Sequence, residues 1–463
     1  MRKTMRVIAQ FTFYDRTGIE AYLEEKAEKG WMLEKISPWG WKFRRMEPKK
    51  LHFAVTYFPK ASVFDPELTE GQRTMEEFCA YAGWKLVDAN GPMQIYCNEA
   101  EKPRPIETDP VTELAAIHAS ARKSYLPSYI MLLVVALLNI GLQIGNLISS
   151  PLDYLCQNST VFNWICQLCL LTMCSQEVFG YFLWYRKARR VAEETGGFVE
   201  TKGHRRFQLF LLSVVIVAFG WLIMSLKGYM AKVMGITMIS IFSVYGLVLG
   251  MQYFLKRMKA SREMNRGITL GMAIVLPIIM SIVLVNSIME DVETDWDRKR
   301  EEAEAYDVNG LTFYAYHDEL PLYVEDLTET DYDRYSTSFS ENSSVLLSIR
   351  TGKQDSRIGE QAPEIRYEIY DVHLPILYDM CLDALLREYE GWYSEDIYGN
   401  LYQDAYFATD AAAWRAERAY QLNSHAEAYY RYLLCYDNRL VTVYLNWEPD
   451  GAQMAAIADT LNK

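Results

Sequence analysis

Long apolar runs dominate the middle of the chain, between Leu126 and Met289. A helix of about 20 apolar residues is long enough to cross a hydrocarbon core of ~30 Å. Glu177 is the one charged residue inside runs of this length, which are Pro127–Ser149, Val161–Tyr185, Phe207–Leu226, Val233–Leu255 and Ile268–Ile288. Buried helices of soluble proteins seldom give so many in succession, so the pattern predicts a five-helix transmembrane bundle over residues 126–290.

Before these runs, apolar and polar residues alternate in short segments, as is typical of half-buried strands. The first segment, from Val7 to Phe13, is followed by a helical pattern that ends in AEKGWMLEKI at Ala27–Ile36. A second strand and helix end in AYAGWKLVDA at Ala80–Ala89. In both places a glycine, which suits the left-handed backbone that closes a helix, is followed by a tryptophan.

The shared Gly-Trp step marks one structural corner that occurs twice, at Gly30, Trp31, Gly83 and Trp84. At each corner we expect the tryptophan to cover the helix end against a sheet. Residues 1–100 are therefore predicted to form an α+β domain with a duplicated, ferredoxin-like βαββ unit, and residues 101–125 a linker.

Residues 291–463 mix strand-like and helix-like patterns. LTFYAY, SVLLSI and IRYEIYDVH are typical of strands, LPILYDMCLDALLREY of an amphipathic helix, and AYYRYLLCYDNRLVTVYLNW of a hairpin that turns at Asp437 and Asn438. The pattern predicts a second α+β domain. Its two cysteines, Cys381 and Cys435, either form a disulfide in an oxidising compartment or remain buried thiols.

The net charge of −13 is unevenly distributed. Residues 291–463 hold 35 acidic and 14 basic residues, a net −21, which leaves 33 basic and 25 acidic residues, a net +8, in residues 1–290. Lysine and arginine crowd the connections after the second and fourth apolar runs, whereas SPLDYLCQNST after the first has none. The positive-inside rule then predicts a plasma-membrane protein whose N-terminal domain is cytoplasmic and whose acidic C-terminal domain is extracytoplasmic. The charge pattern does not indicate nucleic-acid binding.

The sequences FTFYDRTGIEAYLEEKAEKGWMLEKI and WKFRRMEPKKLHFAVTYF resemble the bacterial domain-of-unknown-function family 2812, DUF2812. The similarity covers roughly residues 5–97. It implies a soluble domain fused to membrane spans and a link to PadR-type transcriptional repressors, whose genes often neighbour those of the family. It implies no catalytic residues.

A search for catalytic, cofactor or metal motifs finds none. His425 and Glu427 stand two apart without a third ligand, and no CxxC pair recurs. Adjacent acids such as Glu325 and Asp326 would not aim at one substrate atom. We therefore expect a chain that is not an enzyme and holds no cofactor.

Glu177 is the candidate intramembrane site. It precedes Arg186 by nine residues, hence about 13 Å at 1.5 Å per residue. Ionisable groups at such depth often mark function, so Glu177 could line an ion path. The alternative that we favour is a hydrogen bond between helices, with Gln252 or Asn286 as the partner.

Three functions remain open. We favour a non-enzymatic membrane sensor or regulator that couples the extracytoplasmic domain to a cytoplasmic protein partner. The second is an accessory or core subunit of a small-molecule transporter, and the third is an extracytoplasmic enzyme. Neighbouring genes for an ATPase would favour transport, and a lone repressor would favour regulation.

Overall fold

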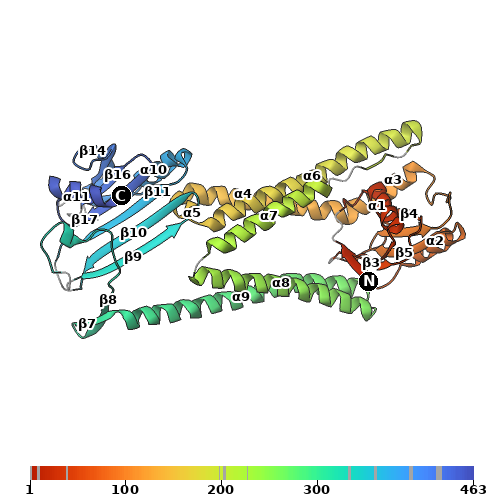
Figure 1. Ribbon diagram of the computed structural model, residues 1–463, viewed down its shortest axis with the longest axis horizontal. Coiled ribbons are helices and arrows are strands. Elements are labelled where there is room, and N and C mark those ends of the chain that lie inside the picture. Colours follow the sequence, from red (N-terminus) through yellow and green to blue (C-terminus); the bar gives the residue numbers. More distant parts are fainter. Residues whose placement is uncertain are drawn as a thin grey trace. The chain divides into compact units, whose positions relative to one another are not determined.

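The computed structural model describes residues 3–7, 11–37, 40–197, 199–201, 205–226, 228–331, 335–358, 362–395, 400–423 and 430–463 (Figure 1). The chain forms two compact units, one of Met1–Ile140 with Ile165–Asn286 and the other of Gly141–Trp164 with Ser287–Lys463. Both units contain helices and strands, in agreement with the predicted mixture of the two. The pair His425 and Glu427 lies outside the described residues.

The N-terminal domain repeats one strand–helix–strand–strand pattern. Its first copy is β1 (Thr4–Val7), α1 (Arg16–Glu28), β2 (Trp31–Lys35) and β3 (Trp41–Arg45). Its second copy is β4 (His52–Tyr57), α2 (Glu70–Tyr81), β5 (Lys85–Asn90) and β6 (Met93–Asn98). The antiparallel sheets have the equivalent orders β1-β3-β2 and β4-β6-β5. Each copy thus has its own sheet, where a ferredoxin-like fold would have a single one.

Helix α1 lies along the second sheet and closes its free edge. The carboxylates of Glu20 and Glu24 accept hydrogen bonds from the backbone N–H groups of Val55 (2.9 Å) and Phe53 (3.3 Å) on β4. An edge strand otherwise presents such groups to any other strand. The apolar face of α1, which includes Leu23, is buried in the core between the two sheets.

Two expectations for this domain are wrong in detail. The first strand was expected to run to Phe13, but β1 ends at Val7 and Phe11 and Phe13 instead pack into the core beside the helices. The segment 101–125 was expected to be a linker, but it contains α3 (Pro110–Ser120) and the π-helix η1 (Ala121–Tyr125), which run directly into α4 (Leu126–Ser149). Its apolar residues, such as Ile117, pack into the same core.

The long helices after α4 and the short α5 (Pro151–Leu155) are α6 (Asn158–Thr195), α7 (Arg205–Ser225), α8 (Gly228–Arg257) and α9 (Arg262–Glu302). Among the described residues, four helices are long and apolar enough to cross a membrane: Pro110–Ser149, Arg206–Ser225, Ala231–Arg257 and Arg262–Glu302. Most of their apolar side chains are exposed, as lipid contact requires.

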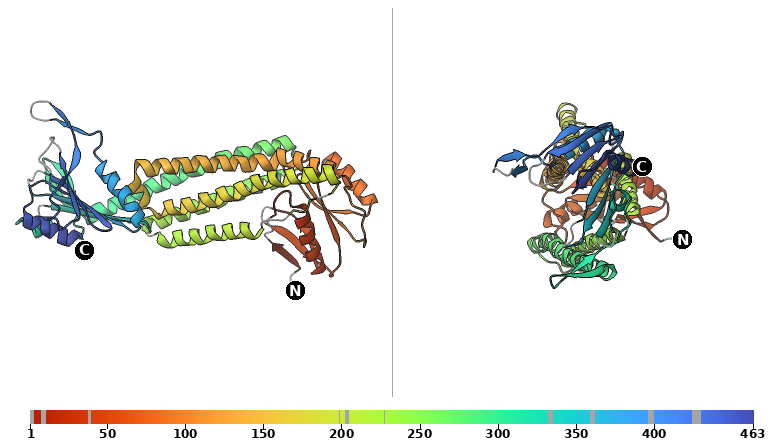
Figure 2. Two further views of the ribbon diagram at one scale, coloured as in Figure 1. Left: turned by 90° about the horizontal axis from the view of Figure 1, so that it is seen from above. Right: turned by 90° about the vertical axis from the view of Figure 1, so that its left-hand side faces the viewer.

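The predicted number of five apolar spans is therefore wrong, because α6 does not qualify. Its apolar side chains are interrupted by Asn163, Gln167, Gln176 and Glu177. In Figures 1 and 2 the N-terminal part of α4 and the later part of α6 run side by side. Glu177 is one of the polar side chains of α6 that face this neighbouring helix, as described below.

The C-terminal domain is built on a seven-stranded antiparallel sheet of order β14-β15-β16-β17-β11-β10-β9. Its strands are β9 (Tyr335–Ser343), β10 (Leu347–Ser356), β11 (Ile365–Val372), β14 (Ala405–Thr409), β15 (Arg418–Asn423), β16 (Tyr430–Cys435) and β17 (Arg439–Leu445). Smaller elements are β7 (Glu304–Val308), β8 (Leu311–Ala315), the 3-10 turns η2 (Val324–Asp326) and η4 (Pro375–Leu377), β12 (Tyr393–Glu395) and β13 (Leu401–Gln403).

Two helices cover opposite faces of this sheet. One face packs with α11 (Gly451–Leu461) in a core that includes Trp414. The other packs with α10 (Tyr378–Leu386) and with α5. The predicted hairpin is present, since β16 and β17 pair antiparallel around Asp437 and Asn438.

Candidate functional site

The N-terminal domain and the helices that follow it share one hydrophobic core. The domain contributes Ile19, Leu23, Phe43, Val55 and Ile95, and the helices contribute Ile117, Ala121, Tyr125, Leu126 and Tyr181. Separating the two would expose to water the apolar surface along which they meet, at about 25 cal/mol per Å². The domain is therefore held firmly on the helices.

Aromatic rings form the centre of this contact. Tyr14 stacks on Trp184 with ring centroids 4.9 Å apart and meets Tyr181 edge-on at 5.4 Å. Phe13 stacks on Tyr125 at 5.3 Å. Burial, and then the nearby Glu177 carboxylate, raise the pKa of Tyr14 to about 12, so its hydroxyl stays protonated at neutral pH.

Glu177 lies beside this aromatic group and is only 2% exposed. The hydroxyl of Tyr125 donates to one carboxylate oxygen of Glu177, and the side-chain amide of Gln208 on α7 donates to the other. The expected partners, Gln252 and Asn286, do not supply these hydrogen bonds. Glu177 thus joins η1, α6 and α7.

A cavity of about 580 Å³ opens next to Glu177. Its walls are mostly apolar and include Met173, Leu211 and Val215, with Glu177 and Gln208 as polar groups. Phe11, from the N-terminal domain, also lines it. A molecule in this cavity would touch both the helices and the domain, as in sites where a few polar groups orient a ligand in an apolar pocket.

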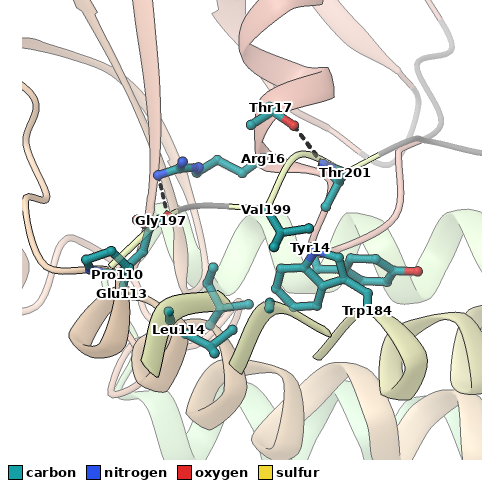
Figure 3. Close-up of a pocket in the computed structure, with 13 residues that line it drawn as sticks. Tyr14, Arg16, Thr17, Pro110, Glu113, Leu114, Trp184, Gly197, Val199 and Thr201 are labelled. Atoms are coloured by element: carbon teal, nitrogen blue, oxygen red, sulfur yellow. Dashed lines mark hydrogen bonds and ion pairs between the residues drawn. The ribbon is translucent and has the colours of Figure 1, made fainter. Parts of the chain in front are cut away.

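A group of polar contacts, here the polar anchor, lies beside Tyr14 and Trp184 of the aromatic group (Figure 3). The guanidinium of Arg16 forms an ion pair with the buried carboxylate of Glu113 on α3. The hydroxyl of Thr201, in the connection between α6 and α7, donates to Asp15 at 2.6 Å, and its backbone N–H donates to the Thr17 hydroxyl at 3.0 Å. This connection is thereby fixed to the start of α1.

The connection between α8 and α9 is attached to the same domain. Lys259 forms an ion pair with Glu67 at 2.6 Å, which holds the pKa of Glu67 below its usual range. The side-chain amide of Asn265, which is fully buried, donates to the backbone oxygen of Phe64 at 3.0 Å. Both basic connections thus contact the N-terminal domain.

Two further carboxyl groups near this anchor have a pKa above the usual range and so remain protonated to higher pH. Burial raises the pKa of Glu20 to about 7, and burial together with Glu113 raises that of Glu107 to about 7. Within the described part of the chain, no three or more His, Cys, Asp or Glu side chains are grouped to hold a metal ion. For both Glu20 and Glu107, burial raises the pKa and the positive charge of Arg16 opposes this effect.

The four corner residues have related but unequal surroundings. Gly30 and Gly83 have φ angles of 79° and 82°, so both close a helix in the left-handed region. Trp84 is 4% exposed and its indole N–H donates to the backbone oxygen of Arg104 at 2.8 Å. Trp31 is only partly buried, with the Arg45 guanidinium 5.0 Å above its ring.

Cys381 and Cys435 are both buried and both free thiols. Cys381 lies on α10 and Cys435 on β16, and both belong to the core between that helix and the sheet. Burial raises the pKa of each thiol, so neither is a reactive thiolate at neutral pH.

Sequence reasoning missed Tyr14, Tyr125, Gln208 and Thr201. None lies near Glu177 in sequence, since Tyr125 and Gln208 are 52 and 31 residues away. The one available signal was the placement of Tyr125 and Gln208 at the ends of apolar runs, where polar side chains reach neighbouring helices.

Residues 15–129 match the protein family described as "Protein of unknown function (DUF2812)". This match confirms the expected resemblance; it begins after β1 and includes the other strands and helices of the two βαββ units, α3 and η1. The chain matches none of the curated proteins and none of the solved structures with which it was compared.

Proposed function

Because residues 15–129 belong to the DUF2812 family, for which no activity is known, we propose a function from the geometry: a non-enzymatic membrane sensor or regulator. In this proposal the C-terminal domain receives a signal outside the cell, and the DUF2812 domain passes it to a cytoplasmic protein. The observation that carries the proposal is the core shared by the DUF2812 domain and the helices. Any shift of α4 or α6 must move or repack that domain.

The distribution of lysine and arginine supports the proposed assignment of the DUF2812 domain to the cytoplasmic side of the membrane. The connections that contact the DUF2812 domain contain the basic clusters, among them Lys256, Arg257 and Lys259. The connection between α4 and α6 has no lysine or arginine, and there the hydroxyl of Ser344 in the C-terminal domain donates to the Leu155 oxygen at 2.6 Å. The positive-inside rule then assigns the DUF2812 domain to the cytoplasm.

Four crossings alone would return the chain to its starting side, so the course of α6 decides where the C-terminal domain lies. Asn158, at the start of α6, accepts a hydrogen bond from Val345 N–H in the C-terminal domain. Thr201, six residues after its end, bonds to the DUF2812 domain. The 38 residues of α6 extend about 57 Å at 1.5 Å each. We propose that α6 also crosses the membrane, with Glu177 and Tyr181 buried against neighbouring helices and Phe179 and Leu183 exposed to lipid.

A partner surface is supported by two exposed aromatic residues on α2. Phe78 is 69% exposed and Tyr81 is 92% exposed, three residues apart on one helix face. The neighbouring residue Cys79 is the one that packs into the core. Exposed aromatic side chains are typical of protein interfaces. The family resemblance makes a PadR-type repressor the first partner to test.

A photo-crosslinker at Tyr81, tested in native membranes, examines this proposal. We expect it to capture one cytoplasmic protein, and we expect the same group at the exposed Glu28 of α1 to capture none. Replacing Phe78 and Tyr81 by serine should abolish capture and should change transcription as deletion of the gene does. Unchanged transcription in the deletion strain would refute a regulatory function.

The transporter alternative is favoured by one observation, the cavity that Glu177 lines. Transport requires that the deletion strain accumulate or lose a small molecule. It also requires a Glu177 substitution to change that flux without changing capture at Tyr81.

A further inference from the structure

The C-terminal sheet has a face that α10 covers only in part. On this face, successive cross-strand rows of residues run over β16, β17, β11 and β10, the strands labelled in Figure 1. The row beneath α10 is largely apolar and contains Cys435, Leu440, Tyr370 and Ile349. The rows farther from α10 are polar, and they line a cleft of about 200 Å³.

The outermost row, here the basic row, consists of Arg431, Tyr444, Arg366 and Lys353 in direct cross-strand register. Tyr444 lies between two guanidinium groups, with Arg431 4.8 Å and Arg366 5.5 Å from its ring centre. Arg431 also lies 5.0 Å over Tyr389. Three cations in one row stand out in a domain whose net charge is −21.

The cations of the basic row are unequally neutralised. Arg366 pairs with Asp355 at 2.6 Å. Among the described residues, no carboxylate lies within 4.0 Å of Arg431 or Lys353. The guanidinium of Arg431 instead lies over the rings of Tyr389 and Tyr444, and a guanidinium group without a carboxylate partner can bind a carboxylate through two parallel hydrogen bonds.

The next row inward is acidic at its centre. It consists of Leu433, Thr442, Glu368 and Thr351. Glu388, from the turn after α10, lies against the same cleft. The cleft therefore presents cations along one side and carboxylates along the other. Positions two apart on a strand are about 7 Å apart at ~3.4 Å per residue.

We propose that this cleft binds a small zwitterionic molecule whose cationic and anionic groups are about 7 Å apart, as at the two ends of a dipeptide. An extended dipeptide spans about 7 Å at ~3.5 Å per residue, which matches the spacing of the two rows. Its carboxylate binds Arg431 and Lys353, and its ammonium group binds Glu368 and Glu388. A purely anionic or purely cationic ligand would be attracted by one row and repelled by the other. The inference concerns binding alone and does not depend on the proposed sensing function.

The test is calorimetric titration of the purified full chain with three alanine dipeptides. Ala-Ala carries both charges, N-acetyl-Ala-Ala only the negative one and Ala-Ala amide only the positive one. We expect saturable binding of Ala-Ala and at least about tenfold weaker binding of each blocked peptide, a difference of ~1.4 kcal/mol. Equal affinities for the three peptides, or no binding of Ala-Ala up to about 10 mM, would overturn the proposal.

Substitutions assign the two rows separately. Arg431→Gln should weaken Ala-Ala and N-acetyl-Ala-Ala by about tenfold, whereas Glu388→Gln should weaken Ala-Ala and its amide but spare the acetylated peptide. Arg415→Gln is the matched control, because Arg415 pairs with Asp459 outside the cleft and should leave all affinities unchanged. Native affinity for Ala-Ala in Arg431→Gln would refute the assignment even if binding occurs.

Discussion

Substitution of Glu177 gives the most direct test of how the DUF2812 domain is held at the helices. Its carboxylate accepts hydrogen bonds from Tyr125 and from Gln208. Glutamine at position 177 keeps the shape and can keep both bonds. Its oxygen accepts from Tyr125, and its NH₂ donates to Gln208 once the Gln208 amide rotates by half a turn. We therefore expect Glu177→Gln to melt close to the native protein.

Leucine at position 177 removes both acceptors and leaves two donors facing an apolar side chain. Hydrogen bonds inside membranes average ~0.6 kcal/mol and reach ~1.7, so two of them are worth roughly 1.2 to 3.4 kcal/mol. A unit of 150–250 residues loses about 2–4 °C in melting temperature per kcal/mol. Glu177→Leu should therefore melt roughly 2–14 °C lower. Its measurement is thermal unfolding of the purified full chain in one detergent.

Gln176→Leu is the matched control for this substitution. Gln176 is the preceding residue of α6, and within the described structure its side-chain oxygen has no hydrogen-bond partner. Its loss should therefore leave the melting temperature unchanged or raise it. A double-mutant cycle with Gln208→Leu should show less than additive losses, because both changes remove the same bond.

Two outcomes contradict this account. If Glu177→Gln melts as low as Glu177→Leu, the charge of the carboxylate, and not its hydrogen bonds, stabilises the junction. If Glu177→Gln melts like the native protein but fails to restore function to a deletion strain, the site must ionise during the working cycle. The transporter alternative would then replace the sensor.

Three other predictions test the domain and its orientation. Trp84→Ala should destabilise the second sheet by roughly 3–5 kcal/mol and Trp31→Ala the first sheet by only about 1–2, because Trp84 is buried and Trp31 is partly exposed; an equal loss of amide-exchange protection in β6 for Trp84→Ala and in β3 for Trp31→Ala would contradict this. Since the folded pKa of Glu20 is about 7 and its ordinary value is 4.5, its contribution to stability is full below about pH 4.5 and lost as pH rises through 7, by at most roughly 3 kcal/mol. Glu20→Gln should therefore melt higher than the native chain at pH 8 and equally at pH 5, and a constant difference would argue against the shift. A reporter active only outside the cell should be active after Lys463 and silent after Glu194, and the reverse pattern would invert the assigned sides.

Periodicity predicted most of the elements, because alternation and the 3.6-residue repeat are local properties. The two βαββ units follow from the recurrence of Gly-Trp, and the hairpin follows from Asp437 and Asn438 between two β-rich runs. Phe78 shows the limit of this reasoning. Phe78 and Cys79 are adjacent on α2, so the helical repeat alone does not decide which of them is buried. The packing of α2 on its sheet buries Cys79 and leaves Phe78 exposed.

The candidate site was predicted only in its centre. An acid in an apolar run identifies Glu177 from sequence alone, but its partners come from η1 and α7, so they depend on how helices pack. The predicted number of apolar spans was wrong for a related reason. Hydropathy treats each residue of α6 alike, although Glu177 and Tyr181 are buried against other helices and do not face lipid.

The π-helix η1 sets the angular phase between α3 and α4. Each α-helical residue advances by about 100° around the axis, and a π-turn holds one residue more than an α-turn. With that extra residue in place, the buried face of α3, which includes Leu114 and Ile117, and the hydroxyl of Tyr125 at the end of η1 are both directed inward. If η1 relaxed to a regular α-helix, one of them would rotate away by roughly a quarter of a turn. Without the extra residue, one continuous helix could not both pack α3 into the core of the domain and direct Tyr125 toward Glu177.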